Sequence, residues 1–140
     1  MKNKRDKIKA KFNGKCAYCG NYLTSFEVDH FFALHREENF PKSLISILND
    51  YDNLVPACRS CNRAKISNIE YLRKQVINGF DNLYKKSALF RKLVRFGMIE
   101  RDVIFEYEKE EHKKEYERLL RVKRKIDDWQ KENNTNYNYW

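Results

Sequence analysis

The sequence predicts a mostly helical α+β fold in which a few short strands accompany a larger set of helices. Three observations carry this prediction. The 140 residues contain only four glycines and two prolines, so few residues interrupt helices. Runs rich in aromatic and β-branched residues are short, as in "YLTSFEVDHFF" and "DNLVPA". The four cysteines fall as two Cys-x-x-Cys pairs, a pattern typical of a small fold held together by a metal ion.

The first half of the chain is expected to form short elements. Residues 4–12 have the composition of a short basic helix, and residues 22–32 have that of a strand. In "PKSLISILND", Pro41 suits the first position of a short helix. Residues 52–57 predict a second, brief strand, and a helix is expected to begin near Ser60.

The second half predicts longer helices. The capping-box spacing of "SNIE" at 67–70 starts a helix that is expected to stop at Gly79. Another helix is predicted over residues 81–96, with Gly97 as its stop. A long helix is then expected over residues 98–131. Its middle, "EKEEHKKE", has no apolar face, which predicts that it projects into solvent or spans to a partner.

The net charge of +9 is unevenly spread along the chain. Residues 1–15 carry seven Lys or Arg against one Asp, and residues 59–95 carry ten against two acidic residues. The segment between them carries two against six. An acidic stretch flanked by two basic ones fits a cation site that a polyanion approaches, although a soluble Lys-rich protein also has such a charge.

The two cysteine pairs predict a structural zinc site. A two-residue gap lets both thiolates of a pair reach one ion, and two such pairs supply the four ligands of a tetrahedron. The ligands would be Cys16, Cys19, Cys58 and Cys61. The alternative is a set of buried or redox-active thiols, but a redox pair would not need a second copy.

Polar residues of a second kind lie between and beside these cysteines. Asp29 and His30 adjoin each other in "VDHFF", while Asn53 and Asn62 lie in "NLVPACRSCNRAK". Asp and Asn supply hard oxygen ligands that suit Mg²⁺. Histidine is the side chain best able to take a proton from water near neutral pH. An Asp–His pair alone would most often be a surface hydrogen bond, and the two asparagines make a site the better interpretation.

The series "CAYCG", "VDHFF" and "NLVPACRSCNRAKIS" resembles the HNH (His-Asn-His) endonucleases, the zinc-containing branch of the His-metal finger nucleases. The resemblance covers residues 5–68 and implies a strand–loop–strand–helix metal finger with a four-Cys zinc knuckle. It implies hydrolysis of phosphodiester bonds in DNA by a nuclease domain at residues 1–68. Residues 69–140 would form a helical extension that binds DNA or dimerises.

The resemblance also implies a role for each site residue. His30 would be the general base and Asp29 a ligand of the catalytic cation. Asn53 matches the middle, structural Asn, which braces the loop that orients His30. Asn62 matches the last position as the second metal ligand; the family name has His there, and Asn favours Mg²⁺ or Mn²⁺. Nearby cations are candidate phosphate contacts: Arg59, Arg63 and Lys65.

Two other functions remain open from the sequence. One is an RNA-cleaving version of the same nuclease, because the motif does not reveal the sugar preference. The other is a non-catalytic zinc module that binds nucleic acid, which would not need Asp29 or His30. The biological role within a restriction, mobile-element or anti-phage system is equally open.

The remaining expectations concern surroundings and assembly. No long apolar run predicts a membrane span or signal peptide, so the expected location is the cytoplasm, with no nucleotide cofactor. Apolar residues at helical spacing in 116–129 predict a homodimer, because the polar stretch before them would carry them away from a small core.

Overall fold

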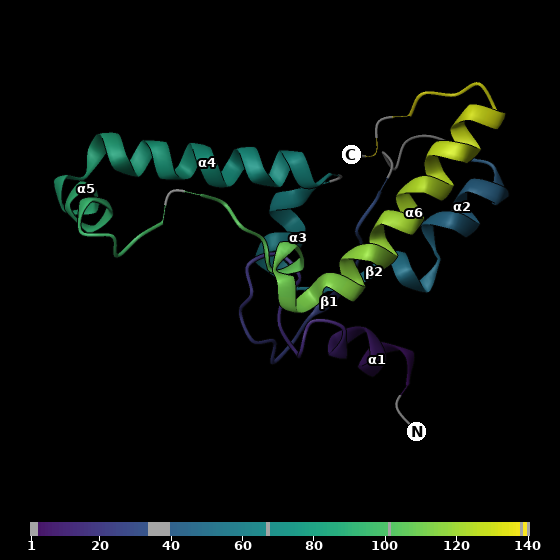
Figure 1. Ribbon diagram of the computed structural model, residues 1–140, viewed down its shortest axis with the longest axis horizontal. Helices are drawn as coiled ribbons and strands as arrows, with labels where there is room; N and C mark the ends of the chain where they lie inside the picture. Colours follow the sequence, from purple (N-terminus) through teal and green to yellow (C-terminus); the bar gives the residue numbers. More distant parts are fainter. Residues whose placement is uncertain (1–2, 34–39, 67, 101, 138, 140) are drawn as a thin grey trace.

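The computed structural model describes residues 3–33, 40–66, 68–100, 102–137 and 139 (Figure 1). The described chain is mostly helical with one two-stranded sheet, which confirms the predicted fold class. In order, the elements are α1 (Lys4–Ala10), β1 (Glu27–His30), α2 (Lys42–Leu48), η1 (Tyr51–Asn53), β2 (Leu54–Ala57), α3 (Arg59–Lys65), α4 (Ile69–Lys86), α5 (Ala88–Arg95), η2 (Glu106–Glu108), η3 (Glu110–His112) and α6 (Lys113–Glu132), where η marks a 3₁₀ helix.

The two strands that carry the predicted site pair with each other. They run antiparallel, with Asp29 opposite Val55 and His30 opposite Leu54. Pro56 lacks an N–H group, and its carbonyl accepts a hydrogen bond from the backbone N–H of Ala17 at 2.9 Å. This bond connects the sheet to the turn that carries Cys16 and Cys19, which we call the knuckle (residues 14–23).

The sequence predicted a first strand over residues 22–32, but β1 covers only Glu27–His30. The strand is shorter because the knuckle uses the first part of that segment. The Cys16 N–H donates to the Asn21 carbonyl, and the Leu23 N–H donates to that of Gly14. Gly20 closes the turn with a φ of +76°. A Cβ at Gly20 would also lie 2.8 Å from Glu106 Oε2, so a larger residue would clash with a distant segment.

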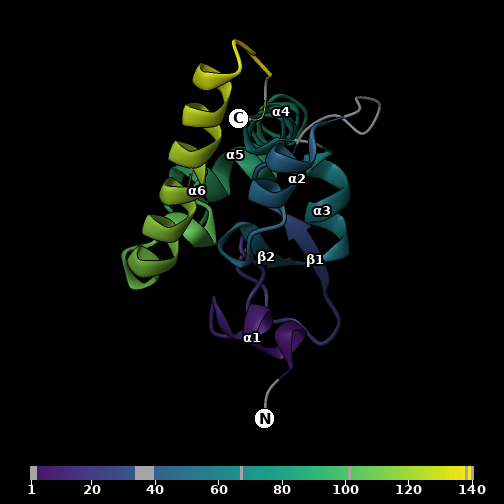
Figure 2. The same cartoon turned by 90° about the vertical axis from the view of Figure 1, so that its right-hand side faces the viewer.

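One hydrophobic core joins the two ends of the chain. It includes side chains from the knuckle, the strands and α2, and others from the segment after residue 104. In both views α2 and α6 lie side by side (Figures 1 and 2), and Trp129 Nε1 donates to Ser43 Oγ at 2.9 Å. The core therefore draws on both sides of the boundary predicted at residue 68.

The predicted break at Gly79 is wrong. Helix α4 begins after its N-cap Asn68, whose side chain accepts from the Tyr71 N–H, and it continues through Gly79 to Lys86. A glycine within a helix costs only about 1 kcal/mol relative to alanine, which the flanking turns offset. The chain bends instead at Ser87, whose hydroxyl caps α5. Ser67, the predicted cap, lies outside the described residues.

The long helix predicted over residues 98–131 is also wrong. After the Gly97 turn, where φ is +73°, the described residues form no helix or strand before η2, and α6 begins only at Lys113. The reason is tertiary: the Glu106 N–H donates to the Tyr18 carbonyl, and the Tyr107 N–H donates to that of Ala17, both at 2.9 Å. Residues 105–107 pack against the knuckle, whereas most of residues 108–115 are exposed and only His112 among them is buried.

The predicted homodimer rested on Tyr116, Leu119, Leu120, Ile126 and Trp129, of which helix α6 buries Leu119, Ile126 and Trp129 and half-buries the other two. Leu119, Val122, Ile126 and Trp129 recur at helical spacing and lie in the core of the same chain. They therefore supply no argument for a second subunit.

Helices α4 and α5 form an arm that extends away from the rest of the molecule (Figure 1). Of the side chains in α4, only Ile69 and Leu72 at its first turn are buried, and α5 buries none. Large apolar side chains are exposed on this arm, Leu89 and Phe96 among them. Among the described residues, we find no helix with the length and apolar character needed to span a membrane.

Candidate active site

The four cysteines gather in one cluster with the dimensions of a zinc site. Their sulfur atoms all lie within 4.8 Å of one another, and those of Cys19 and Cys58 are 3.8 Å apart. In a tetrahedron with Zn–S bonds of about 2.3 Å, neighbouring sulfurs lie about 3.8 Å apart. Cys16 and Cys19 come from the first knuckle, whereas Cys58 and Cys61 come from the start of α3. The cluster is compatible with zinc.

Backbone hydrogen bonds and thiol acidity support the same interpretation. The Cys58 N–H points to Cys16 Sγ at 3.3 Å, and the Cys61 N–H points to Cys58 Sγ at 3.4 Å. The hydrogen bond with Cys61 lowers the pKa of Cys16 to about 5, whereas burial raises the pKa of Cys19 to about 11. Cys16 and Cys19 are thus not both thiolates at neutral pH unless a cation lowers the pKa of Cys19.

His30 ends β1, and a single side chain fixes its ring. His30 Nε2 lies 2.8 Å from Asn49 Oδ1, and Asn49 follows directly after α2. An amide oxygen only accepts hydrogen bonds, so Nε2 carries the hydrogen in this contact. In the neutral imidazole, Nδ1 is then the nitrogen with the free lone pair.

Asp29 lies before His30, and two buried donors hold its carboxylate. The Tyr18 hydroxyl donates to Asp29 Oδ2 at 2.5 Å, and Lys65 Nζ donates to the same oxygen at 2.8 Å. Asp29 Oδ1 accepts no hydrogen bond from the described part of the chain. Lys65 Nζ also donates to the His30 carbonyl at 2.7 Å.

Asn53 is fully buried and connects three segments around the site. Its Oδ1 accepts from the Phe32 N–H at 2.9 Å, while its Nδ2 donates to the carbonyls of Phe32 at 3.0 Å and Leu48 at 2.7 Å. Its backbone carbonyl accepts from the Phe31 N–H at 2.8 Å. The residues just after His30 are thereby fixed to the end of α2.

Asn62, in the second turn of α3, faces the same strand. Its Nδ2 donates to Glu27 Oε2 at 2.6 Å. Because side chains alternate along a strand, Glu27 and Asp29 share one face of β1, and α3 lies against it. Glu27 and Asp29 thus both lie on the side of β1 that faces α3, where Asn62 contacts Glu27 and Lys65 contacts Asp29.

The three predicted phosphate contacts divide into two groups. Arg59 and Arg63 are exposed and lie four residues apart, on one face of α3. Lys65 is buried instead, with its ammonium bound to Asp29 and His30. The sequence prediction for Lys65 therefore needs correction, because a buried and paired ammonium is not presented to a phosphate.

The comparisons with known proteins match this part of the chain. Residues 16–68 match the family model described as HNH endonuclease. These residues are therefore similar to an HNH endonuclease domain. The HNH region is also similar to YoqL, a candidate HNH endonuclease from the SPbeta prophage of Bacillus subtilis strain 168. The two are 36% identical over 61 residues, a stretch that covers 42% of this chain and 26% of YoqL. The chain thus spans about a quarter of that relative. No solved structure matches the chain significantly.

Three residues of the HNH site were missed from the sequence. Glu27 carried a usable signal, because it precedes Asp29 by two residues in a predicted strand. Tyr18 lies between Cys16 and Cys19, but nothing local indicates that its hydroxyl reaches Asp29. Asn49 follows a helix within the segment between His30 and Asn53, and only the folded chain brings it to the imidazole.

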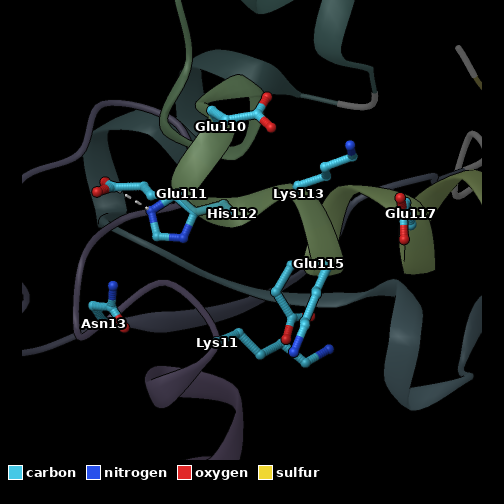
Figure 3. A pocket seen from close by; sticks show the side chains of 9 residues that line it. Lys11, Asn13, Glu110, Glu111, His112, Lys113, Glu115 and Glu117 are labelled. Atoms are coloured by element: carbon cyan, nitrogen blue, oxygen red, sulfur yellow. Dashed lines mark ion pairs between the residues drawn. The ribbon is translucent and has the colours of Figure 1, made fainter.

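A second cluster of possible ligands lies apart from the HNH site. Glu106, Glu111 and His112 lie close enough to hold a metal, and the last two line a cavity of about 600 Å³ (Figure 3). Glu106 already pairs with Lys109 at 2.8 Å, Lys15 at 3.4 Å and His112 at 3.1 Å. Two ammonium groups on one carboxylate repel a further cation, so this cluster is better explained as a buried ion-pair network.

Proposed function

We propose that this chain is a divalent-cation-dependent endonuclease that hydrolyses phosphodiester bonds in DNA. One observation carries the proposal. At the end of β1, a histidine whose Nε2 is held by an amide oxygen adjoins a carboxylate, one oxygen of which accepts no hydrogen bond from the described residues. This combination suits activation of a water molecule next to a cation, and a module that only binds nucleic acid would not need it.

In this proposal His30 is the general base. Asn49 holds the ring by Nε2, so Nδ1 receives the proton that the attacking water loses. Asn53 keeps the chain after His30 in place through its three side-chain hydrogen bonds. Its role is to position the base and not to react.

The residues that would hold the catalytic cation are Asp29 and Asn62. Their carboxylate and amide oxygens are hard donors and fit Mg²⁺ or Mn²⁺. Two protein ligands leave the other coordination positions to water and substrate, as is usual for Mg²⁺. When bound, the cation stabilises the negative charge that develops on the phosphate and on the departing 3′ oxygen.

The polyanionic substrate would lie along α3 and the arm. Arg59 and Arg63 are exposed on the helix that carries Asn62. Five further cations on the arm are exposed and form no ion pair with an acidic residue in the described ranges: Lys74, Lys85, Lys86, Lys92 and Arg95. The 18 residues of α4 span about 27 Å, or roughly eight base pairs of duplex. The arm would thus bind DNA that flanks the cut.

One chain carries one general base and would cut one strand in each binding event. Since the apolar face of α6 is buried within the chain, we propose a nick as the primary product and not a paired double-strand break. Cleavage of both strands would require a second encounter.

The test is to incubate purified protein with supercoiled plasmid and with single-stranded RNA, with and without Mg²⁺. We expect Mg²⁺-dependent nicking of the plasmid that leaves 5′ phosphate and 3′ hydroxyl ends. His30→Ala should lower the rate by at least about 100-fold while zinc content and DNA binding stay unchanged. The same purification of His30→Ala also controls for a contaminating nuclease.

The other outcomes separate the alternatives. Cleavage of RNA alone would replace DNA as the substrate. DNA binding without cleavage at any Mg²⁺ or Mn²⁺ concentration would favour the non-catalytic zinc module. Wild-type rates in His30→Ala would refute the assignment of the base.

A further inference from the structure

Asp29 is held by donors that reach it from both halves of the cysteine cluster. Tyr18 lies between Cys16 and Cys19 in the first knuckle, and Lys65 lies in the last turn of α3, which begins after Cys58. Both donate to Asp29 Oδ2, at 2.5 Å and 2.8 Å. The orientation of this carboxylate thus depends on how the knuckle and α3 are held together.

Both donors are rigidly packed. Tyr18 is 1% exposed, and its ring stacks on Phe31 and meets Phe105 and Tyr107 edge-on. Lys65 is 0% exposed, and its ammonium lies 5.6 Å from the centre of the Tyr18 ring. Lysine is almost never fully buried unless it is paired, so its place here requires the acceptors that Asp29 and the His30 carbonyl supply.

The two contacts divide the carboxylate into two functionally different oxygens. Oδ2 already accepts from a hydroxyl and an ammonium, whereas Oδ1 accepts no hydrogen bond from the described residues. A carboxylate fixed in this way offers only Oδ1 to a cation, and it offers it in one direction. Donors behind a ligand that restrict its rotation typically strengthen metal binding, because less freedom is lost when the metal binds.

We propose that Tyr18 and Lys65 are positioning residues that hold Asp29 as a single-oxygen ligand for the catalytic cation, so that the cysteine cluster determines the geometry of the nuclease site. This inference rests on the proposed function. Lys65 then acts behind the ligand, from the protein interior, and the zinc cluster contributes to cation affinity in addition to stability.

Two other roles for Lys65 make different predictions. If Lys65 only balances charge in the interior, its loss lowers stability and leaves cation affinity unchanged. If its ammonium occupies the place of the cation, its loss raises cation affinity. The proposal requires that affinity falls when either donor is removed.

The experiment measures Mn²⁺ binding by electron paramagnetic resonance in zinc-loaded protein that carries His30→Ala, so that no cleavage occurs. Tyr18→Phe removes only the hydroxyl, and Lys65→Met keeps the length of the side chain without its charge. We expect each change to weaken Mn²⁺ binding about tenfold. In protein with an intact His30, the Mg²⁺ concentration for half-maximal cleavage should rise by a similar factor.

Two exposed residues provide matched controls. Tyr22 is 78% exposed in the same knuckle hairpin, and Lys131 is exposed near the end of α6. Tyr22→Phe and Lys131→Met should bind Mn²⁺ as the parent protein does. Circular dichroism and one zinc per chain establish that each variant is folded, and Tyr18→Phe decides the test if Lys65→Met does not fold.

The outcomes separate this inference from the proposed function. Unchanged Mn²⁺ affinity in folded Tyr18→Phe, or tighter binding in Lys65→Met, would overturn the inference while the parent protein still binds Mn²⁺ and cuts DNA. A parent protein that neither binds Mn²⁺ nor cleaves would overturn the proposed function and the inference with it.

Discussion

Two asparagines near His30 should differ sharply in what they contribute. Asn53 is fully buried and makes three side-chain hydrogen bonds, whereas Asn49 is exposed and makes one, to the imidazole. Asn53→Ala removes three buried hydrogen bonds that contribute about 1–1.5 kcal/mol each, so the free energy of unfolding should fall by roughly 3–5 kcal/mol. That is a large part of the 5–15 kcal/mol typical of a domain.

Asn49→Ala should have the opposite profile. Its side chain is exposed and hydrogen-bonds only to His30 among the described residues, so the free energy of unfolding should change by less than about 0.5 kcal/mol. The Nε2 hydrogen of His30 would lose its acceptor, and the imidazole ring would then no longer be held in the tautomer with the hydrogen on Nε2. We expect the cleavage rate to fall by about tenfold or more, as positioning of a general base requires.

Urea denaturation followed by circular dichroism, in buffer with zinc, measures the first effect, and plasmid nicking at saturating Mg²⁺ measures the second. Each variant serves as the control for the other. The reasoning is refuted if the free energy of unfolding of Asn53→Ala lies within about 1 kcal/mol of the wild-type value, because the three buried hydrogen bonds then do not brace the loop. It also fails if Asn49→Ala cuts at the wild-type rate.

Three further predictions follow from other parts of the chain. Cys58→Ser should lose about one bound zinc per chain and the folded state, which elemental analysis and circular dichroism will measure. Burial alone would raise the pKa of Glu106, but hydrogen bonds from Lys109 and His112 lower it from 4.5 to about 2. This carboxylate should therefore contribute about 3 kcal/mol of stability above pH 5, lost as the pH falls from 4.5 towards 2, and Glu106→Gln should remove that pH dependence. Lys85→Ala with Lys86→Ala should lower the salt dependence of DNA binding by about two charges, measured by fluorescence anisotropy.

The parts that the sequence predicted well are those set by short-range chemistry. The Cys-x-x-Cys spacing predicted that the four sulfur atoms gather in one cluster, since two thiolates separated by two residues can bind the same ion. The start of α3 near Ser60 and the stop at Gly97 followed from local capping. Asn53 was expected to brace the loop, and its three hydrogen bonds agree with that expectation.

Two of the errors have a common physical cause, which is long-range packing. Residues 102–112 have a charged composition that suits a helix, yet Phe105 and Tyr107 bury their rings against the knuckle, and the backbone between them pairs there. Lys65 was interpreted as a phosphate contact because lysines are usually exposed. Only the folded chain places the Asp29 carboxylate 2.8 Å from its ammonium.

The pairing of Glu106 and Tyr107 with Tyr18 and Ala17 has a consequence for synthesis of the chain. A ribosome produces the chain from its N-terminus, so the cysteines emerge well before the segment that covers Tyr18. Contacts between residues so distant in sequence form late and slowly. A nascent or prematurely terminated chain can therefore bind metal at its cysteines and still leave Tyr18 uncovered. We expect nuclease activity to appear only once residues beyond 107 have been translated, which would limit cleavage by incomplete products inside the cell that makes them.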